Sequence, residues 1–386
     1  MAGRMPLGRE SEELLRAIIR RPSERTTREI VGLSREVRDW NALLDVAEAH
    51  RIAPMLYVRL KELAIPLAAE VQDRLKNLYE RNALHSLMNA AELIALLRAF
   101  DGAAIEAMPF KGVVLGASVY HDLAMRSAGD LDVLIHYRDL LRATALLATR
   151  GYELKTLVKP DGTPEAQDYF EYHFERPSDG IVLEVRWRLE LTQPRFRRNL
   201  GMDWVWPYRR TTELAGAQVP DIQPEILLLV LCMHASKHVW SRLIWICDVV
   251  QLLRSEPSLN WRAAIEQARK TGLWRALALG VLLAHRVADA EVPEPILRRF
   301  RADRTANKLA LHIQKNLFIA PGSTPSSRIP YNIQLLGIHD RLALLGSLQF
   351  LKPNERDRAV IHLPEPLHAL YYLIRPYRIL RDRSAR

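Results

Sequence analysis

The sequence predicts an α+β protein in which a small mixed sheet is flanked by helical regions on both sides. Apolar residues recur every three or four positions through residues 11–100, as they do on one face of a helix. From residue 101 to about 191, short apolar runs alternate with amphipathic segments, which indicates strands joined by helices. Strongly apolar helical segments follow from residue 224. We therefore expect three parts, a helical N-terminal module, a sheet-containing core and a helical C-terminal domain, at residues 1–100, 101–222 and 223–386.

The composition is that of a globular protein with an affinity for anions. At 386 residues the chain is too long for one small core. Its 48% hydrophobic and 26% charged residues are ordinary for a globular protein. The formal net charge of +10 favours anionic partners. A nucleoside triphosphate, a nucleic acid and an anionic membrane surface all meet that condition, so charge alone does not choose among them.

The cysteines and the apolar runs bear on the compartment. Cys232 and Cys247 both lie in apolar stretches, which favours buried thiols in a reducing compartment over a disulfide. The first residues lack the apolar stretch of a signal peptide. The longest apolar run, residues 226–233, is too short to span a bilayer. We expect a cytoplasmic protein with no transmembrane segment.

The N-terminal region contributes helices and few residues with catalytic chemistry. Residues 72–100 have the spacing of one long helix. His50 and His85 are more typical of packing or surface histidines than of ligands. This region would pack on the core or shape the acceptor side of a site.

Residues 110–135 carry the clearest chemical signal. Asp130 and Asp132 are two apart at the start of an apolar strand, so both side chains point to the same face. Two like charges placed that close cost free energy unless a cation lies between them, and Mg²⁺ prefers such oxygen ligands. Upstream, Lys111 and Gly112 stand at a predicted strand-to-helix turn, where phosphate can approach backbone N–H groups.

The order of these features resembles the nucleotidyltransferase superfamily, whose core has a glycine turn followed by an Asp-x-Asp strand. More closely, it is similar to a bacterial family of largely uncharacterised nucleotidyltransferases with a Lys-Gly, Tyr, Arg and Gly-Asp-x-Asp signature. Here those positions are Lys111-Gly112, Tyr120, Arg126 and residues 129–132. An isolated Asp-x-Asp is usually a solvated loop or a cap, so the ordered set carries the resemblance.

The resemblance implies a Mg²⁺-dependent or Mn²⁺-dependent enzyme with a nucleotidyltransferase core at residues 101–222. It would move a nucleoside monophosphate from a nucleoside triphosphate to a hydroxyl-bearing acceptor and release pyrophosphate. Lys111 and Gly112 would contact the outgoing phosphates. Arg126 would bind phosphate or orient the aspartates, with a structural salt bridge as the alternative.

Glu184 is the expected third carboxylate. Residues 169–175 and 181–189 read as an antiparallel strand pair around a Pro-Ser-Asp-Gly turn. By spacing alone, Glu184 is more typical of a solvent-facing charge on an edge strand, whereas the resemblance implies that it completes the metal site with Asp130 and Asp132. The chain departs from the pattern twice: Arg186 stands where the family often has His, and Val113 where the superfamily has Ser or Gly.

Residues 204–224 read as irregular, with a turn at Gly216, and a strongly apolar helical region follows to about residue 253. If that region is one unbroken helix, one stripe holds His234, His238, Ser241, Trp245 and Asp248, with Lys237 at its edge.

Three interpretations of this stripe compete. A zinc site is disfavoured because Ala235 replaces the Glu of the zinc-protease motif. In a buried structural network, Asp248 would accept hydrogen bonds from His238 or Trp245. In a functional surface facing the active cleft, the acceptor pocket would be formed by His234, Lys237, His238 and Asp248. The resembled family carries a similar helix, which fits either of the last two.

The chain ends in further helical patterns at residues 276–288, 308–318 and 341–350, and in a basic amphipathic stretch from residue 363. The acceptor stays open: a small molecule, a sugar, a peptide or another protein. The rival from another class is a catalytically inactive protein of this fold that binds nucleic acid or an acidic partner. No usual RNA-binding motif is evident.

Overall fold

The computed structural model describes residues 7–159, 162, 170–189 and 200–319, and isolated residues beyond them. The chain divides into two units, residues 1–335 and 336–386, and the fold below is that of the first. Three predicted features, the loop at 321–330, the helix at 341–350 and all but isolated positions of the stretch from 363, lie outside the described residues.

The N-terminal region is helical, as predicted. It comprises α1 (Arg9–Ile19), α2 (Glu24–Glu36), α3 (Trp40–Ala49), α4 (Ala53–Glu62) and α5 (Ala69–Gly102). Side chains of Ser23 and Asp39 accept hydrogen bonds from backbone N–H groups in the first turns of α2 and α3, which satisfies donors that a helix start leaves unpaired. The 34 residues of α5 confirm the single long helix expected from the leucine spacing.

Helix α5 is also the one described helix whose length and apolar composition would allow it to cross a membrane. Its most apolar window is 39% buried within the fold. A helix that packs within a protein core meets the same criterion, so the described residues contain no clear transmembrane segment.

The sheet has five strands in the order β1-β2-β5-β4-β3. They are β1 (Ala107–Pro109), β2 (Leu131–Ile135), β3 (Glu153–Leu154), β4 (Glu171–Arg176) and β5 (Ile181–Arg186). β2 and β5 run parallel, and the other neighbours are antiparallel, so the sheet is mixed. The expected α+β fold is therefore confirmed, and so is the antiparallel pair of β4 and β5.

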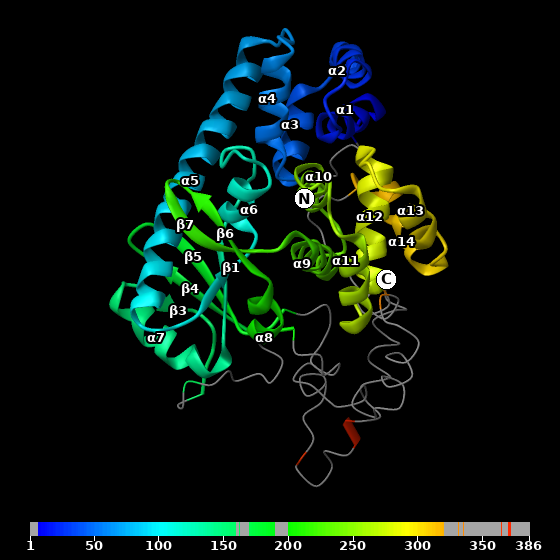
Figure 1. The fold of residues 1–386 in the computed structure, drawn as a ribbon. Helices are drawn as coiled ribbons and strands as arrows, with labels where there is room; N and C mark the ends of the chain where they lie inside the picture. Colours follow the sequence, from blue (N-terminus) through cyan, green and yellow to red (C-terminus); the bar gives the residue numbers. More distant parts are fainter. Residues whose placement is uncertain are drawn as a thin grey trace. The chain divides into compact units, whose positions relative to one another are not determined.

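Alternation along β2 separates its two faces. Leu131 and Val133 are buried in an apolar cluster with Phe100 and other residues of the second half of α5. The opposite face carries Asp132. Helix α6 (Gly112–Ser118) joins β1 to the loop before β2, and α7 (Leu140–Thr149) follows a 3₁₀ turn, Tyr137–Asp139. Figure 1 shows α5 running along the sheet and α6.

The prediction of an irregular segment at residues 204–224 is wrong. A short helix α8 (Met202–Val205) and a 3₁₀ turn (Trp206–Tyr208) precede a hairpin of β6 (Arg209–Leu214) and β7 (Ala217–Ile222). The expected turn at Gly216 is present, and both loop residues have positive φ, as in a type I′ turn. Leu214 is the one fully buried residue of β6, so this strand lacks the apolar alternation that would reveal it.

Within the described residues up to 319, six helices follow: α9 (Pro224–Lys237), α10 (Leu243–Ser255), α11 (Trp261–Lys270), α12 (Trp274–Ala288), α13 (Glu294–Arg301) and α14 (Arg304–Asn316). The apolar helical region expected from residue 224 is present, but it is not one unbroken helix, because residues 238–242 form a loop between α9 and α10. Val239 and Trp240 both have positive φ in this loop.

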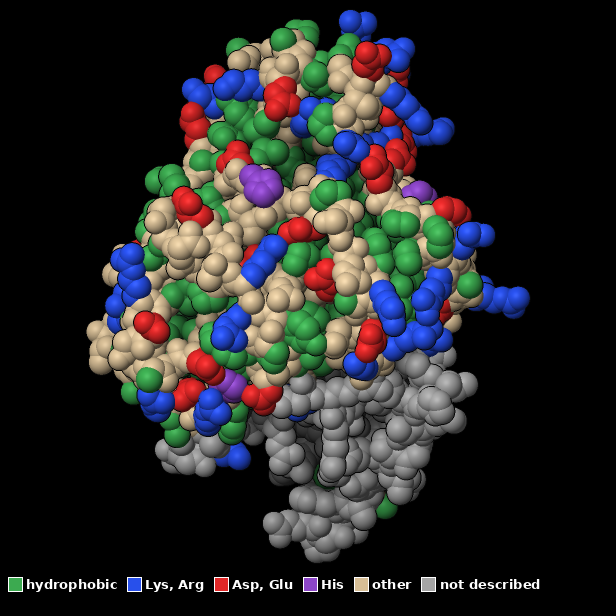
Figure 2. Space-filling view, in the orientation of Figure 1, with side chains coloured by type: hydrophobic (Ala, Val, Ile, Leu, Met, Phe, Trp, Pro, Cys, Tyr) green, Lys and Arg blue, Asp and Glu red, His purple; other side chains and the backbone are tan. Residues whose placement is uncertain are grey.

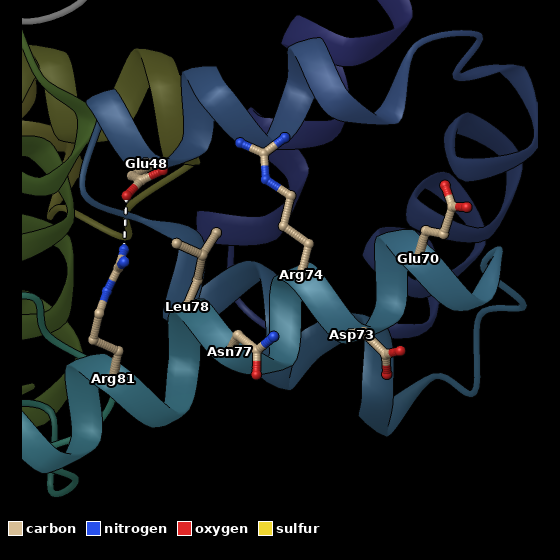
Figure 3. A pocket seen from close by; sticks show the side chains of 7 residues that line it. All are labelled: Glu48, Glu70, Asp73, Arg74, Asn77, Leu78 and Arg81. Atoms are coloured by element: carbon tan, nitrogen blue, oxygen red, sulfur yellow. Dashed lines mark hydrogen bonds and ion pairs between the residues drawn. The ribbon is translucent and has the colours of Figure 1, made fainter.

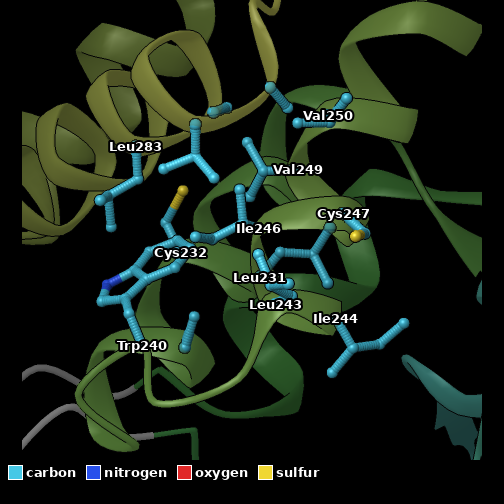
Figure 4. Close-up of a cluster of buried hydrophobic side chains, with 14 of the residues drawn as sticks. Leu231, Cys232, Trp240, Leu243, Ile244, Ile246, Cys247, Val249, Val250 and Leu283 are labelled. Carbon is cyan, nitrogen blue, oxygen red and sulfur yellow. The ribbon is translucent and has the colours of Figure 1, made fainter. Parts of the chain in front are cut away.

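Trp240 fixes the break between α9 and α10. Its side chain is fully buried, and its Nε1 donates a hydrogen bond to Ser236 Oγ at 3.1 Å. Figure 4 shows its ring lying near Cys232 within the apolar cluster. The burial of this ring holds Val239 and Trp240 in a backbone conformation that residues other than glycine rarely adopt.

The two terminal helical regions share one large apolar cluster. Leu14 and Ile30 from the first helices belong to it, as do Leu228 in α9 and Leu279 in α12. In Figure 1, α1 lies beside α12, far apart in sequence. The expected domain boundaries at residues 100 and 222 fall in the last turn of α5 and at the end of β7, and the three-part division stays a prediction.

Candidate functional site

Two adjacent strands bring the three predicted carboxylates together. Asp132 on β2 lies directly opposite Glu184 on β5 in the parallel register, and Asp130 immediately precedes β2. One ligand oxygen from each of Asp130, Asp132 and Glu184 lies within 4.8 Å of the others. The face that Leu131 and Val133 leave free is thus the face on which the acids converge.

Like charges at this spacing repel. At an effective dielectric constant of about 20, two unit charges 4.8 Å apart repel by about 3.5 kcal/mol. Neighbouring cations offset this repulsion: Lys111 Nζ lies 2.9 Å from Asp132 Oδ2, and Arg186 Nε lies 3.4 Å from Asp132 Oδ1. Arg186 also pairs with Glu184 and with Glu171.

Proton affinities reflect this balance. Burial would raise the pKa of Asp132, but Lys111 and Arg186 outweigh it and hold that pKa below its ordinary value. Burial and the negative charge of Asp132 raise the pKa of Glu184 despite the presence of Arg186. Of these two carboxyls, Glu184 is therefore the one that binds a proton more readily.

The three carboxylates fit a hard divalent cation. They offer oxygen donors from three side chains at one point, which suits Mg²⁺ or Mn²⁺. Among the described residues, this trio is the group of three or more His, Cys, Asp or Glu side chains that could hold a metal. His234 and His238 belong to no such group, so the zinc interpretation has no support in the structure.

The Lys111-Gly112 turn is strained. Lys111 has φ 65° and ψ −151°, a region that is essentially confined to glycine and costs roughly 1–3 kcal/mol. Gly112 follows with φ +53°. The ion pair with Asp132 holds Lys111 in this conformation, and its Nζ also lies 3.4 Å from His234 Nδ1. Strain of this kind persists where the surroundings fix it, often at functional sites.

Arg126 lies behind this turn in a salt bridge with Asp248. Its Nε and Nη2 donate to the two carboxylate oxygens of Asp248, each at 2.9 Å. Tyr120 donates a third hydrogen bond to Asp248 at 2.7 Å. The remaining Nη1 donates to the carbonyl oxygen of Gly112 at 3.2 Å, so Arg126 links α10 to the turn.

Asp248 is therefore structural in this arrangement. Its partners are Tyr120 and Arg126, not His238 or Trp245 as the structural interpretation expected. It is 2% exposed and does not line the cavity that contains the acids, so its place in the expected acceptor pocket is not borne out by the geometry.

The carboxylates open into a cavity of about 440 Å³. Its charged lining is mixed, with more cations than anions. The basic residues are Arg51, Lys111, Arg126, Arg186, Lys237 and Arg242, and the acidic ones are Asp130, Asp132, Glu171 and Glu184. A cavity with this balance of charge suits a polyanion that arrives with a metal ion.

His234, Lys237 and His238 line the same cavity, although the helix breaks between them and Trp245. The His238 ring stacks on Trp245 with centroids 5.1 Å apart, and the His234 and His238 centroids are 4.7 Å apart. Burial and the charge of Lys111 hold the pKa of His234 well below its ordinary value, so this imidazole is neutral.

Three charged lining residues were not anticipated from the sequence: Arg51, Glu171 and Arg242. Glu171 on β4 pairs with Arg186 in the strand register and lies 3.7 Å from Lys237 Nζ. Although burial opposes ionisation, a hydrogen bond with His173 and nearby cations lower its pKa to about 2. The sequence did hold one signal for Glu171. It lies two residues before His173, the strand partner of Glu184, so it is on the same face of the sheet as Glu184.

A second depression lies along α5 (Figure 3), where six of its seven lining residues follow one another around the helix and Glu48 reaches over from α3. Both of its arginines face acids: Arg74 pairs with Asp45 at 2.5 Å and Arg81 with Glu48 at 2.9 Å. We assign it no ligand.

Comparison with known proteins points to one family. The model of a family described as uncharacterised nucleotidyltransferase matches residues 36–289, a range that contains all three carboxylates. No curated protein matches the chain. A similar solved structure is the crystal structure of an antigenic nucleotidyltransferase-like protein from Paracoccidioides brasiliensis. It is 20% identical, the match covers 49% of this chain and 91% of that chain, and the TM-score is 0.30.

Proposed function

The chain belongs to the family of uncharacterised nucleotidyltransferases, and we propose that it transfers a nucleoside monophosphate from a nucleoside triphosphate to a hydroxyl-bearing acceptor. The observation that carries this proposal is the convergence of Asp130, Asp132 and Glu184 within 4.8 Å in a cavity rich in cations. In the transfer, the acceptor oxygen bonds to the α-phosphorus while the bond from that phosphorus to the bridging oxygen breaks. Pyrophosphate leaves with the electron pair, and the proton of the hydroxyl passes to water.

Asp130, Asp132 and Glu184 would hold Mg²⁺ or Mn²⁺, which supplies positive charge to the phosphates and to the leaving pyrophosphate. Lys111 and the Gly112 backbone would bind the outgoing phosphates, since the Lys111 ammonium group already lies in the cavity.

The remaining residues would position these groups. We assign Arg126 to the orientation of the turn through Gly112, because its other donors are bound to Asp248. His234, Lys237 and His238 would form the acceptor side, since they line the cavity without belonging to the carboxylate trio.

The alternative, an inactive protein that binds nucleic acid or an acidic partner, calls for a broad basic surface. On the face in Figure 2, acidic side chains lie among the basic ones over the described part of the surface. That face offers no wide field of one sign, and we retain catalysis as the proposal.

A screen of radiolabelled nucleoside triphosphates tests the proposal, with pyrophosphate release and label transfer as readouts. Glu184→Gln should abolish turnover with little loss of triphosphate binding, because Glu184 completes the site beside the attacking hydroxyl. Glu213→Gln, an exposed glutamate on β6, is the matched control and should behave as wild type. Full turnover in Glu184→Gln would reject the assignment of this residue.

A further inference from the structure

Two arginines in the cavity lack a counter-charge. Lys111, Arg186 and Lys237 each face an acid that lines the cavity, and Arg126 is bound to Asp248. In contrast, the side chains of Arg51 and Arg242 make no ion pair or hydrogen bond with any described residue, although both line the cavity.

A backbone contact between distant segments sets these two arginines beside each other. The N–H of Leu243 donates to His50 Nδ1 at 3.0 Å, and the N–H of Ile244 donates to the His50 carbonyl oxygen at 3.2 Å. Arg51 and Arg242 are the chain neighbours of His50 and Leu243. The start of α4 and the start of α10 therefore present one arginine each from adjoining positions.

The surroundings do not neutralise this pair. The Arg242 guanidinium lies 5.7 Å from the Trp245 ring centroid, and its Nε is buried without a hydrogen-bond partner. Burial and the charge of Arg51 lower the pKa of Arg242, and Asp130 offsets this only in part. Arg51 has φ 59°, a left-handed conformation that is uncommon for a side-chain-bearing residue.

The arginines of the depression in Figure 3 give the contrast. Arg74 and Arg81 are each matched by an acid within 3 Å. Two adjacent guanidinium groups that no acid matches attract negative charge, so their position in the cavity indicates a place for an anion.

We propose that Arg51 and Arg242 bind the β- and γ-phosphates of the nucleoside triphosphate, which leave as pyrophosphate. The inference rests on the proposed function for the identity of the anion. The α-phosphate would lie at the carboxylate trio, and the polyphosphate chain would extend from there past Asp130 to the arginine pair. Guanidinium groups suit this role because their planar N–H donors can bind phosphate oxygens in pairs.

Two consequences follow from this placement. The N-terminal helical region, through Arg51, takes part in substrate binding together with the loop between α9 and α10. The site also selects for chain length, since a nucleoside monophosphate does not reach the pair and a triphosphate does.

Calorimetric titration with inorganic tripolyphosphate tests the pair without any need for turnover. Arg51→Ala and Arg242→Ala should each lower the affinity for tripolyphosphate by about tenfold or more, as expected for loss of a charged hydrogen bond. Affinity for inorganic monophosphate should change far less. Arg298→Ala on α13, an exposed arginine, removes the same charge at a distance and should leave both affinities unchanged.

The outcomes are distinct. Unchanged tripolyphosphate affinity in both variants, an equal loss in Arg298→Ala, or no binding by the wild type would each overturn the arginine site. If an alanine variant does not fold, Arg51→Gln and Arg242→Gln keep part of the side chain and give the same comparison. Because tripolyphosphate carries no nucleoside, the arginine site stands on this titration even if no nucleotide is turned over, in which case the proposed function alone fails.

Discussion

Replacing Asp248 by asparagine should test how strongly the fold depends on the buried pair that supports the site. Asp248 is 2% exposed and accepts three hydrogen bonds, two from Arg126 and one from Tyr120. Arg126 is 7% exposed, so water cannot replace the lost carboxylate charge. Breaking one partner of a buried pair typically costs about 3–5 kcal/mol, since the remaining charge is left uncompensated.

Urea and thermal unfolding of Asp248→Asn would measure that cost. We expect a loss of about 3–5 kcal/mol in the free energy of unfolding and a fall in Tm on the order of 10 °C. Asp221→Asn is the matched control, because Asp221 is also buried but its partner Arg210 has a side chain 29% exposed to water. That change should cost less, because Arg210 keeps Glu256 as a partner and its charge reaches water. A free energy of unfolding for Asp248→Asn within about 1 kcal/mol of wild type would refute the reasoning.

Three further changes follow from the structure. His238→Ala should lower activity with little loss of stability, because His238 is half-buried at the cavity and stacks on Trp245; a large drop in Tm would make it structural instead. Gly280→Ala should destabilise by about 1–3 kcal/mol, since the new Cβ would lie 2.4 Å from Cys232 Sγ, and a wild-type urea midpoint would contradict this. Burial lowers the pKa of His50 to about 3, below its unfolded value of about 6.5. The stability that the neutral His50 contributes is therefore complete above pH ~6.5 and is lost as the pH falls from ~6.5 to ~3. Urea titrations from pH 7 to 4 should therefore show a steeper loss in wild type than in His50→Gln, and equal slopes would contradict the account.

The parts of the fold that the sequence predicts are those with a local pattern. Asp130 and Asp132 alternate with the apolar residues Leu131 and Val133, and that alternation fixes which face of β2 the acids occupy. The long α5 and the pair of β4 and β5 follow from helical spacing and from a turn between alternating runs. Only the pairing of β2 with β5, which brings Glu184 beside Asp132, needed the family resemblance.

The break between α9 and α10 has no such local pattern. Residues 226–233 are all buried, so this part of α9 shows no alternation of polar and apolar faces. A change in such an alternation is what would mark a helix break in the sequence. The cause lies in the docking of Trp240 against Cys232 and Gly280, which is a tertiary contact. Propensity and periodicity describe neighbours along the chain and do not detect it.

The site residues that sequence reasoning missed depend on contacts across long separations. Leu243 and His50, which align Arg242 with Arg51, are 193 residues apart. Arg126 and Asp248 are 122 residues apart. The helical stripe that contains Asp248 therefore could not reveal that its partner is Arg126. Spacing finds residues that one element presents together, whereas these pairs form only when two elements meet.

Pyrophosphate release measured against Mg²⁺ concentration tests the central claim most directly, in wild type, Asp132→Asn and Asp73→Asn. Asp73 is an exposed acid in the depression of Figure 3 and serves as the matched control. We expect Mg²⁺-dependent release by wild type and Asp73→Asn, and a loss of about a hundredfold or more in Asp132→Asn, because a metal contribution is worth several kcal/mol. Release by Asp132→Asn at the wild-type rate, or release that is unchanged when Mg²⁺ is removed, would contradict this expectation.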